Sequence, residues 1–388
     1  MSIRIEPLAP HHRQEYATLL QTDPRSLIFA SNGYLDLLAA LAPAATCHRW
    51  VARDASGTMR GAMNFFILPG KWGGIANALP FFGSPCGLVV PDGSAEIKAA
   101  LLEHFLAVAQ NAGCSACTFI TSPLDPDPHS CQALLSPTFE DERIGLITPL
   151  PAPSATLEQD LLALCQQKTR NLIRKGMKAG FRLDRSDTRE NWRFLQETHL
   201  ANMAVVNGAS RPGSFFTLME EGALPDLERR LYTACLDETP VAGLLLLYHQ
   251  QTVEYFVPAI QVEHRASQPL SFLILQAMRE AVMAGYRWWN WGGTWLTQKS
   301  LYHFKKGFGA TDHHYYYYVK IFDPSLLAVD RQELLREYPL FFTYPFNQVL
   351  PAPIDQTGLP RISSTLATHI STESSPVLST SSGDSGGS

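Results

Sequence analysis

The sequence lacks several features that would assign a function directly. Its 388 residues contain no apolar run of about 18 residues, so we predict no transmembrane helix. The segment that follows Met1 has no apolar core of the kind a signal peptide needs, which favours a cytoplasmic location. A G-x-S-x-G motif is also missing, and with it the usual nucleophile of a hydrolase triad. These absences argue against the simplest membrane, secreted and hydrolase interpretations.

Residues that bind metals or form disulfides are sparse. The seven cysteines are scattered, and the close pair Cys114 and Cys117 has no second pair at zinc-ribbon spacing. His313 and His314 are adjacent but lack further ligands at metal-binding spacing. We therefore predict reduced thiols, no metal and no resident cofactor.

Acidic residues are missing from one aromatic stretch. No Asp or Glu lies between Glu280 and Asp312, although the whole chain carries a net charge of −5. The stretch reads as a strand, RWWNW (287–291), that stops at Gly-Gly and is followed by a loop and the motif FKKGFG (304–309). Glycines let the backbone approach a ligand, and cations without acids favour an anion. The pattern predicts an anion site; the alternative is a buried strand followed by a solvated basic turn.

A second basic region is the predicted helical run 159–180. It carries many cations and few acids, together with an apolar stripe at helical spacing. As a cluster these cations favour a polyanionic phosphate partner, because many weak contacts add together. The alternative is a surface helix whose charges are merely solvated. The cations concerned are Lys168, Arg174, Lys175 and Lys178.

The order of predicted elements occurs twice along the chain. A helix over 94–112 is followed by a strand at 114–121. A helix that begins at Pro269 ends at Gly285, and the strand at Arg287 follows it. In both places strands precede the helix. This repeated order predicts a duplicated α/β domain.

The expected fold class is therefore α/β, with two tandem domains, each a mixed central sheet flanked by helices. Three prolines in five residues mark a linker, and a Ser-, Thr- and Gly-rich composition marks a disordered tail. The predicted ranges are 1–148 for the first domain, 149–156 for the linker, 157–348 for the second domain and 351–388 for the tail.

Two segments together resemble a known family. IRKGMKAGF (173–181) and NWGGTW followed by LYHFKKGFGA (290–310) are similar to motifs of the FemABX aminoacyltransferases, which belong to the wider N-acetyltransferase-like (GNAT) fold group. The resemblance implies two tandem GNAT-like domains in a bacterial transferase of cell-wall biogenesis. It implies transfer of an amino acid from aminoacyl-tRNA to an amine, often on a peptidoglycan precursor. One departure is the absence of the long charged helical hairpin that some members use toward tRNA.

The resemblance also implies roles for individual residues. Lys305 matches the lysine of the family's Phe-Lys motif, so we predict that it stabilises the negative charge that develops on the carbonyl. Arg211 matches an arginine that grips acceptor phosphates, and Lys71 is predicted to help orient an anionic acceptor; a solvated loop arginine is the alternative for Arg211. Further substrate contacts are predicted for Tyr255, for which a core position is the alternative, and for Asn290, Thr294 and Phe304. Contacts with tRNA phosphates are predicted for Lys168, Arg174, Lys175, Lys178 and Lys306.

The donor is predicted from the turns that precede the two repeated helices. Coenzyme A enzymes of the GNAT fold hold pyrophosphate on the backbone N–H groups of a glycine-rich turn. Here the turn 263–269 has no glycine, and Pro269 removes one N–H donor. In the first half Asp92 stands where a phosphate would go. Aminoacyl-tRNA is therefore the predicted donor.

The predicted acceptor is an anionic amine, with peripheral membrane contact as a further expectation. Two alternatives stay open: an acyl-CoA-dependent N-acyltransferase, and a non-catalytic GNAT-like module that binds an anion.

Overall fold

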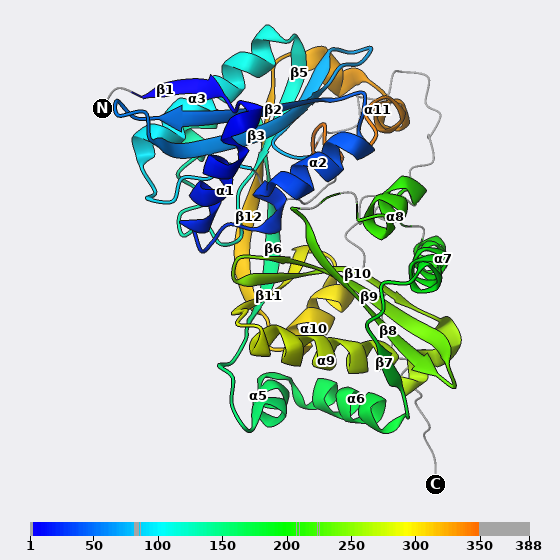
Figure 1. Cartoon of the computed structure of the whole chain (residues 1–388). Helices are drawn as coiled ribbons and strands as arrows, with labels where there is room; N and C mark the ends of the chain where they lie inside the picture. Colours follow the sequence, from blue (N-terminus) through cyan, green and yellow to red (C-terminus); the bar gives the residue numbers. More distant parts are fainter. Residues whose placement is uncertain are drawn as a thin grey trace, which may run out of the picture.

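A computed structural model describes residues 3–80, 85, 87–206, 208, 210–222, 224 and 226–348. Within these residues, one twelve-stranded mixed sheet runs through the whole molecule (Figure 1). Its strand order is β1-β2-β3-β4-β5-β12-β6-β11-β10-β9-β8-β7. The predicted disordered tail, 351–388, and Cys86 lie outside the described residues, and the other six cysteines form no disulfide.

The first half of the sheet is a meander followed by a helical crossover. Strands β1 to β4 pair antiparallel, and α3 then returns the chain so that β5 pairs parallel to β4. Ser94 caps α3, accepting a hydrogen bond from the Ile97 N–H at 3.4 Å, and the helix buries Leu101 and Phe105 against the sheet. The bounds are β1 Arg4–Pro7, α1 Arg13–Gln21, α2 Asn32–Leu41, β2 Thr46–Arg53, β3 Met59–Leu68, β4 Gly74–Asn77, α3 Ala95–Asn111, β5 Cys114–Ile120 and α4 Gln132–Leu135.

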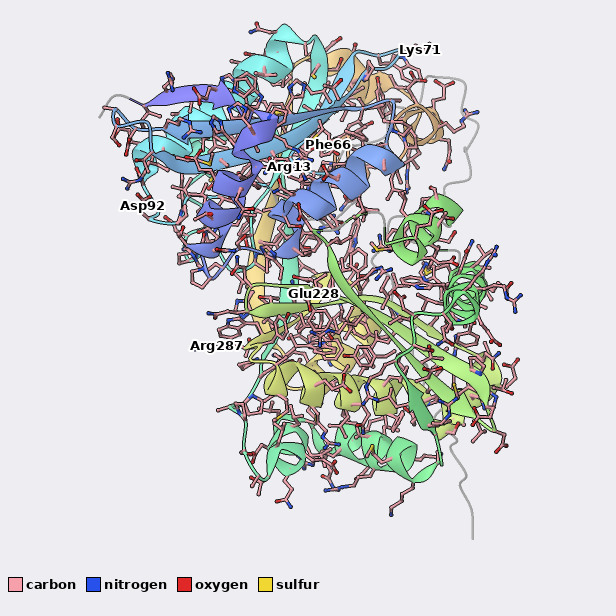
Figure 2. All side chains as sticks on the ribbon, in the orientation of Figure 1. Arg13, Phe66, Lys71, Asp92, Glu228 and Arg287 are labelled. Carbon is pink, nitrogen blue, oxygen red and sulfur yellow. The ribbon has the colours of Figure 1, made fainter. Side chains whose placement is uncertain are left out.

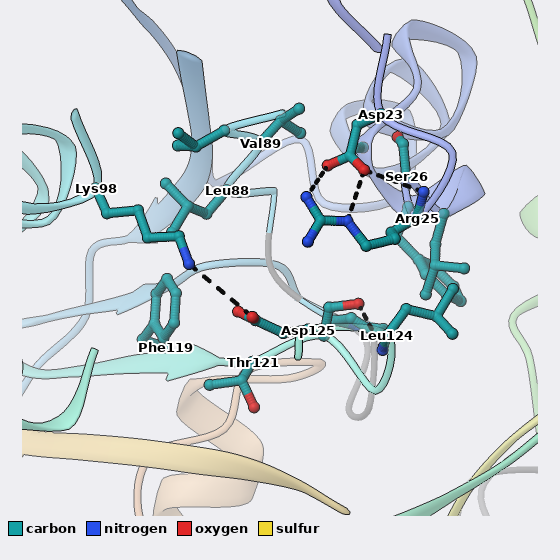
Figure 3. A pocket seen from close by; sticks show the side chains of 16 residues that line it. Asp23, Arg25, Ser26, Leu88, Val89, Lys98, Phe119, Thr121, Leu124 and Asp125 are labelled. Atoms are coloured by element: carbon teal, nitrogen blue, oxygen red, sulfur yellow. Dashed lines mark hydrogen bonds and ion pairs between the residues drawn. The ribbon is translucent and has the colours of Figure 1, made fainter. Parts of the chain in front are cut away.

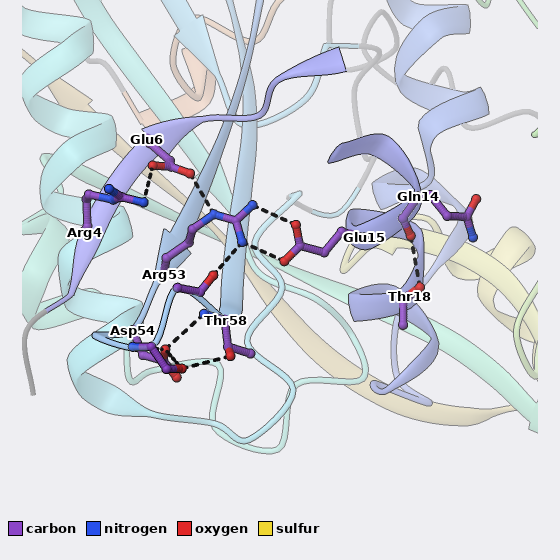
Figure 4. Close-up of polar contacts among 10 residues, drawn as sticks. Arg4, Glu6, Gln14, Glu15, Thr18, Arg53, Asp54 and Thr58 are labelled. Atoms are coloured by element: carbon purple, nitrogen blue, oxygen red, sulfur yellow. Dashed lines mark hydrogen bonds and ion pairs between the residues drawn. The ribbon is translucent and has the colours of Figure 1, made fainter. Parts of the chain in front are cut away.

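A buried arginine holds the outer elements of the first half together. Arg53 at the end of β2 is only 6% exposed. Its guanidinium bonds Glu6 of β1 at 2.7 Å and Glu15 of α1 at 2.6 Å (Figure 4). Because a buried charge is costly unless it is paired, this residue fixes β1 and α1 to the sheet.

The second half repeats this order, which confirms the predicted α/β class with two similar domains. Strands β8 to β10 form a meander, α9 crosses over, and β11 pairs parallel to β10. Helix α7 packs on one face of these strands and α9 on the other, with α6 outside α9 (Figure 1). The bounds are α5 Leu157–Leu164, α6 Gln167–Lys178, β7 Arg182–Asp184, α7 Arg189–Val205, α8 Gly213–Glu220, β8 Glu228–Leu236, β9 Thr239–His249, β10 Thr252–Ile260, α9 Pro269–Met283, β11 Trp288–Trp295, α10 Lys299–Gly307 and α11 Arg331–Glu337.

The two halves exchange a strand at the centre of the sheet. Strand β6 (Phe139–Pro149) leaves the first half and pairs with β11, while β12 (Thr311–Ile321) leaves the second half and pairs with β5. The two exchanged strands also pair with each other along their length. The predicted linker 149–156 therefore marks a change in the sequence. The hydrogen bonds of the sheet, by contrast, continue from one half of the molecule into the other. How the chain divides into domains stays a prediction.

Two predicted elements differ in detail from the structure. The strand predicted to stop at Gly292-Gly293 continues to Trp295, because Trp291 and Gly292 form a bulge against β6 and Gly293 then pairs with Gly145. Gly292 has φ +73°, which glycine adopts without strain, and its N–H donates to Asn290 Oδ1 at 2.9 Å. The helical run 159–180 is two helices, α5 and α6, because Cys165 takes an extended conformation between them. Among the described residues, no helix is both long and apolar enough to cross a membrane.

Candidate active site

The two parallel strands of the second half separate early. Strands β10 and β11 pair over only three residue pairs, the last of which joins Glu254 to Asn290. Beyond this pair β10 bulges at Phe256, and β11 keeps only its pairing with β6, which runs from Trp288 to Trp295. Glu254 is 3% and Asn290 2% exposed, so the separation of the strands, which we call the second split, carries a buried carboxylate and a buried amide. In α/β sheets, ligands bind where strands part at their carboxyl ends.

Lys305 lies beside this split, on the last turn of α10. Its ammonium donates to the carbonyl oxygen of Gly293 at 2.8 Å, to that of Gly292 at 3.4 Å and to Thr294 Oγ1 at 3.3 Å. The residue is 1% exposed. The structure therefore places a buried ammonium on the carbonyls of the glycine bulge, where it holds the backbone of β11 in shape. The predicted role of Lys305, stabilising the negative charge that develops on the carbonyl, stays a prediction.

Aromatic rings fill the side of the split that faces α9 and α10. Tyr255 lies 4.9 Å from the ring centre of Trp291, and Phe304 lies 5.9 Å from the same ring. The Trp291 indole N–H donates to Thr148 Oγ1 at 2.9 Å. Tyr255 thus occupies the core position that was its alternative, and Phe304 borders this aromatic cluster as a half-buried ring.

Arg211 approaches the β10 bulge from the opposite face. Its guanidinium carbon lies 4.2 Å from the ring centre of Phe256 and 5.0 Å from that of Phe215. The Arg211 backbone N–H donates to His199 Nε2 at 3.4 Å. Burial, helped by the positive charge of Arg211, lowers the pKa of His199 to about 4, so this histidine is neutral at pH 7. Arg211 therefore contacts β10, one of the two strands of the split, and its role in binding an acceptor stays a prediction.

Two predicted cations are not brought to the split. Lys71 is exposed on the loop after β3, where its ammonium lies 4.5 Å from the Trp72 ring centre. Figure 2 places it at the far end of the first half, away from Arg287 at the start of β11. Lys306 forms an ion pair with Asp312 at 3.2 Å. The acceptor contact of Lys71 and the tRNA contact of Lys306 stay predictions.

Four of the predicted phosphate-binding cations share the outer surface of α6. Of the five cations predicted to contact phosphate, Lys306 is the one outside this helix; the four on α6 are exposed, and none of these four has an ion-pair partner among the described residues. Gly176 brings this helix onto the N-terminus of α9, since a Cβ atom there would meet the Gln268 carbonyl oxygen at 2.6 Å. The structure therefore packs the Gly176 face of α6 on the start of α9 and leaves the four cations on the exposed face of the helix. They are Lys168, Arg174, Lys175 and Lys178.

The turn before α9 bears on the choice of donor. Residues Val262–Ser267 form a 3-10 helix, and Gln268 follows with φ 65°. The side chains of this turn bond within it: Gln268 Nε2 donates to the Arg265 carbonyl oxygen and Ser267 Oγ to that of His264, both at 2.8 Å. Pro269 begins the helix without an N–H. The turn fits a pyrophosphate poorly, and a tRNA donor stays the prediction.

Sequence reasoning missed three buried charged residues near the strand exchange. Glu254 was treated only as part of a strand. Arg143 of β6 is 4% exposed, forms an ion pair with Asp141, and lies 3.5 Å from the Trp295 ring centre. Burial raises the pKa of the Asp141 carboxyl, although Arg143 opposes that rise. The sequence signal that could have found these residues is a charged side chain within an apolar strand. Such a side chain is buried when its strand has neighbours on both sides in the sheet.

Comparison with known proteins agrees with this architecture. Residues 165–306, from α6 to α10, match the model of the acetyltransferase (GNAT) domain family. No curated protein matches the sequence. The class that the fold defines is therefore a tandem protein of the GNAT fold, as the motifs predicted.

Three solved structures show the same arrangement over most of this chain. FemX aligns with a TM-score of 0.66 and 14% identity, covering 84% of this chain and 99% of FemX. A tandem GNAT protein from the clavulanic acid biosynthesis pathway has a TM-score of 0.51 and 16% identity, covering 82% and 98%. The C-terminal domain of a protein described as a lysylphosphatidylglycerol synthetase from Agrobacterium fabrum has a TM-score of 0.51 and 13% identity, covering 84% and 96%. At these identities the likeness concerns the fold, and it confirms the resemblance to FemABX-type tandem GNAT proteins.

Proposed function

We propose that this protein transfers an aminoacyl group from aminoacyl-tRNA to an amine at the second split. The observation that carries the proposal is the early separation of β10 and β11, which leaves Glu254 and Asn290 buried where the strands part. A buried carboxylate at the point where two parallel strands part is a candidate for proton transfer. The fold shared with FemX supports acyl transfer as the reaction class.

The chemistry needs orientation and proton transfer more than a covalent intermediate. The amine nitrogen attacks the ester carbonyl carbon, and the bond from that carbon to the ribose oxygen then breaks. The nitrogen loses a proton and the departing ribose oxygen gains one. We assign the first proton transfer to the Glu254 carboxylate. Lys305 holds the backbone carbonyls of Gly292 and Gly293 in place, and we assign to its charge the stabilisation of the developing oxyanion.

The outer face of α6 supports a polyanionic donor. Lys168 and Lys178 lie about 15 Å apart along the helix at a rise of about 1.5 Å per residue. Such a span is longer than one phosphate group and suits a nucleic-acid backbone. Exposed cations without acidic partners release counterions when phosphate binds, which makes the affinity dependent on salt.

The acceptor is an amine on an anionic molecule of the peptidoglycan-precursor type, in the cytoplasm, with peripheral membrane contact where that precursor is lipid-bound. Arg211 supports an anionic acceptor, because its guanidinium stacks on Phe256 beside the split and can bond phosphate or carboxylate. Fixed by two aromatic rings, this guanidinium loses little freedom on binding.

The test is a transfer assay with a pool of labelled aminoacyl-tRNAs and cell-envelope precursors, run with and without RNase. We expect label on an amine acceptor, and we expect RNase treatment of the donor to abolish it. Label that is transferred equally well from acyl-CoA after RNase treatment would instead establish the second candidate, an acyl-CoA-dependent N-acyltransferase, which the acetyltransferase domain match favours. Absence of transfer from either donor would leave the third candidate, a non-catalytic anion-binding module, which the burial of Lys305 favours.

A further inference from the structure

The first half contains its own parting of parallel strands, which we call the first split. Strands β4 and β5 pair as far as Asn77 and Thr118, and only β5 continues beyond. A cavity lies past this point, between the end of β5, the segment before α3 and the connection from α1 to α2. Its apolar lining includes Leu27, Val89 and Phe119 (Figure 3).

Two oppositely charged pairs face this cavity. One pair, Asp23 and Arg25, is closed on itself: Arg25 Nε donates to Asp23 Oδ1 at 2.9 Å and a terminal nitrogen donates to Oδ2 at 3.3 Å. That terminal nitrogen also donates to the Pro91 carbonyl oxygen at 3.3 Å. The bidentate ion pair of Asp23 and Arg25 therefore lines the cavity with most of its hydrogen-bonding groups already used.

The second pair is loose. Lys98 Nζ lies 3.9 Å from Asp125 Oδ1, which is too long for a hydrogen bond (Figure 3). The two side chains are only 17% and 18% exposed. Among the described residues the Lys98 ammonium has no hydrogen-bond acceptor, while Asp125 Oδ1 accepts only the Asp127 N–H at 3.0 Å. Both charges therefore keep most of their hydrogen-bonding capacity directed at the cavity, out of bulk water.

The size of the cavity limits its ligand. It offers about 60 Å³ to the centres of water-sized molecules. Since one water needs about 10–15 Å³ by this measure, the space suits roughly four to six non-hydrogen atoms. Glycine and alanine fall in this range and serine lies just above it, whereas an aromatic amino acid or a nucleotide is far too large.

We propose that this cavity binds a small free amino acid as its zwitterion. The ligand's carboxylate accepts hydrogen bonds from the Lys98 ammonium, and its ammonium donates to the Asp125 carboxylate. Insertion replaces one 3.9 Å contact by two short charge-assisted hydrogen bonds. The cavity charges sum to zero before and after binding, so a lone anion or a lone cation would leave one buried charge uncompensated. The small side chain lies against Val89 and Phe119. This site is separate from the proposed transfer reaction and does not depend on it.

The test is a calorimetric titration of the full chain with glycine, L-alanine and L-serine. Acetate and methylamine each carry one of the two charges, and L-tryptophan carries both but exceeds the space. We expect saturable binding of the small zwitterions alone. No saturable heat from any of them, or equal binding of acetate or methylamine, would overturn the proposal.

Two variants and one matched control locate the binding. Lys98→Met and Asp125→Asn remove one charge each with little change in shape, and we expect each to weaken alanine binding by at least about tenfold. Arg60→Gln is the control: it removes an ion pair outside the cavity, in which Arg60 lies 2.6 Å from Asp92. The affinity of this variant for alanine should stay unchanged. Circular dichroism checks the folding of each variant. If only one of the two cavity variants folds, that variant alone is enough to test the proposal. Unchanged affinity in a folded cavity variant would refute the assignment.

Discussion

The first and second splits occupy equivalent places but carry different side chains. In the first split, the last paired residue of β4 is Asn77, whose amide clamps the chain's own C-terminal segment: Nδ2 donates to the Phe342 carbonyl oxygen at 2.8 Å and Oδ1 accepts the Phe342 N–H at 2.7 Å. In the second split the corresponding residue of β10 is Glu254, a buried carboxylate. Equivalent positions of the two halves therefore hold a structural residue, Asn77, in the first half and, in our proposal, a catalytic residue, Glu254, in the second. Function depends on the residue placed there, since the fold itself is common to both.

The largest expected effect comes from neutralising the carboxylate of the second split. Glu254→Gln keeps the shape of the side chain but removes its ability to accept a proton, so we expect the transfer rate to fall by about 10²- to 10⁴-fold. Single-turnover transfer with aminoacyl-tRNA measures the rate. Glu263→Gln, on the exposed turn before α9, is the matched control and should leave the rate unchanged. A Glu254→Gln enzyme as fast as this control would show that the two splits do not differ in chemistry.

Removing the buried ammonium of Lys305 tests whether it fixes the backbone of β11 beside the second split. Lys305→Ala leaves the carbonyl oxygens of Gly292 and Gly293 without their donor, so we expect the free energy of unfolding to fall by about 2 kcal/mol. Transfer should be lost as the bulge relaxes. Urea denaturation and the transfer assay measure the two effects. Lys306→Ala, which breaks only the partly exposed pair with Asp312, should cost less than about 1 kcal/mol. Equal stability losses would contradict a supporting role for Lys305.

The clamp of the first split predicts a loss of stability without a loss of chemistry. Asn77→Ala removes both hydrogen bonds to Phe342 from a buried site, which should lower the free energy of unfolding by about 1–3 kcal/mol. The transfer rate per folded molecule should not change. Asn111→Ala, at the exposed end of α3, is the control for urea denaturation. If Asn77→Ala abolished transfer in folded protein, the first split would share in the reaction.

The smallest effect concerns the surface that only the second half carries. Each of Lys168→Gln, Arg174→Gln and Lys175→Gln should lower the slope of log affinity for tRNA against log salt by about 0.7–0.9, one phosphate contact each. Filter binding across a salt series measures this slope. Arg182→Gln is the control, because Arg182 is already paired with Glu238 at 2.8 Å. If all variants had the same slope as the unmodified protein, the cations of α6 would not contact the tRNA phosphates.

Much of the fold follows from local pattern. The helix over 94–112 and the strand at 114–121 appear as α3 and β5 within a residue at each end, because capping, apolar spacing and the glycine that ends the helix are local signals. The repeated order of elements was also visible in the sequence. The glycine pair at Gly292-Gly293 predicts a strand end, whereas the structure has a bulge there, because a bulge depends on the partner strand as well as on the local sequence.

The candidate site depended more on distant partners. Lys305 was singled out by its motif, yet its burial follows from α10 folding back on β11. Glu254 gave little signal by itself, because only the parting of β10 from β11 makes its position special. The sequence also gives no sign that Lys71 lies at the far end of the first half, away from Arg287 (Figure 2).

The sequence by itself determined the types of elements, their repeated order and the basic face of α6, because these depend on neighbours within a few turns of chain. Only the tertiary structure decided which strands meet. The exchange of β6 and β12, and the contact of Asn77 with Phe342 across 265 residues, arise from pairing and packing between segments that no local pattern connects. Those long-range contacts place one split against the chain's own backbone and leave a buried carboxylate in the other.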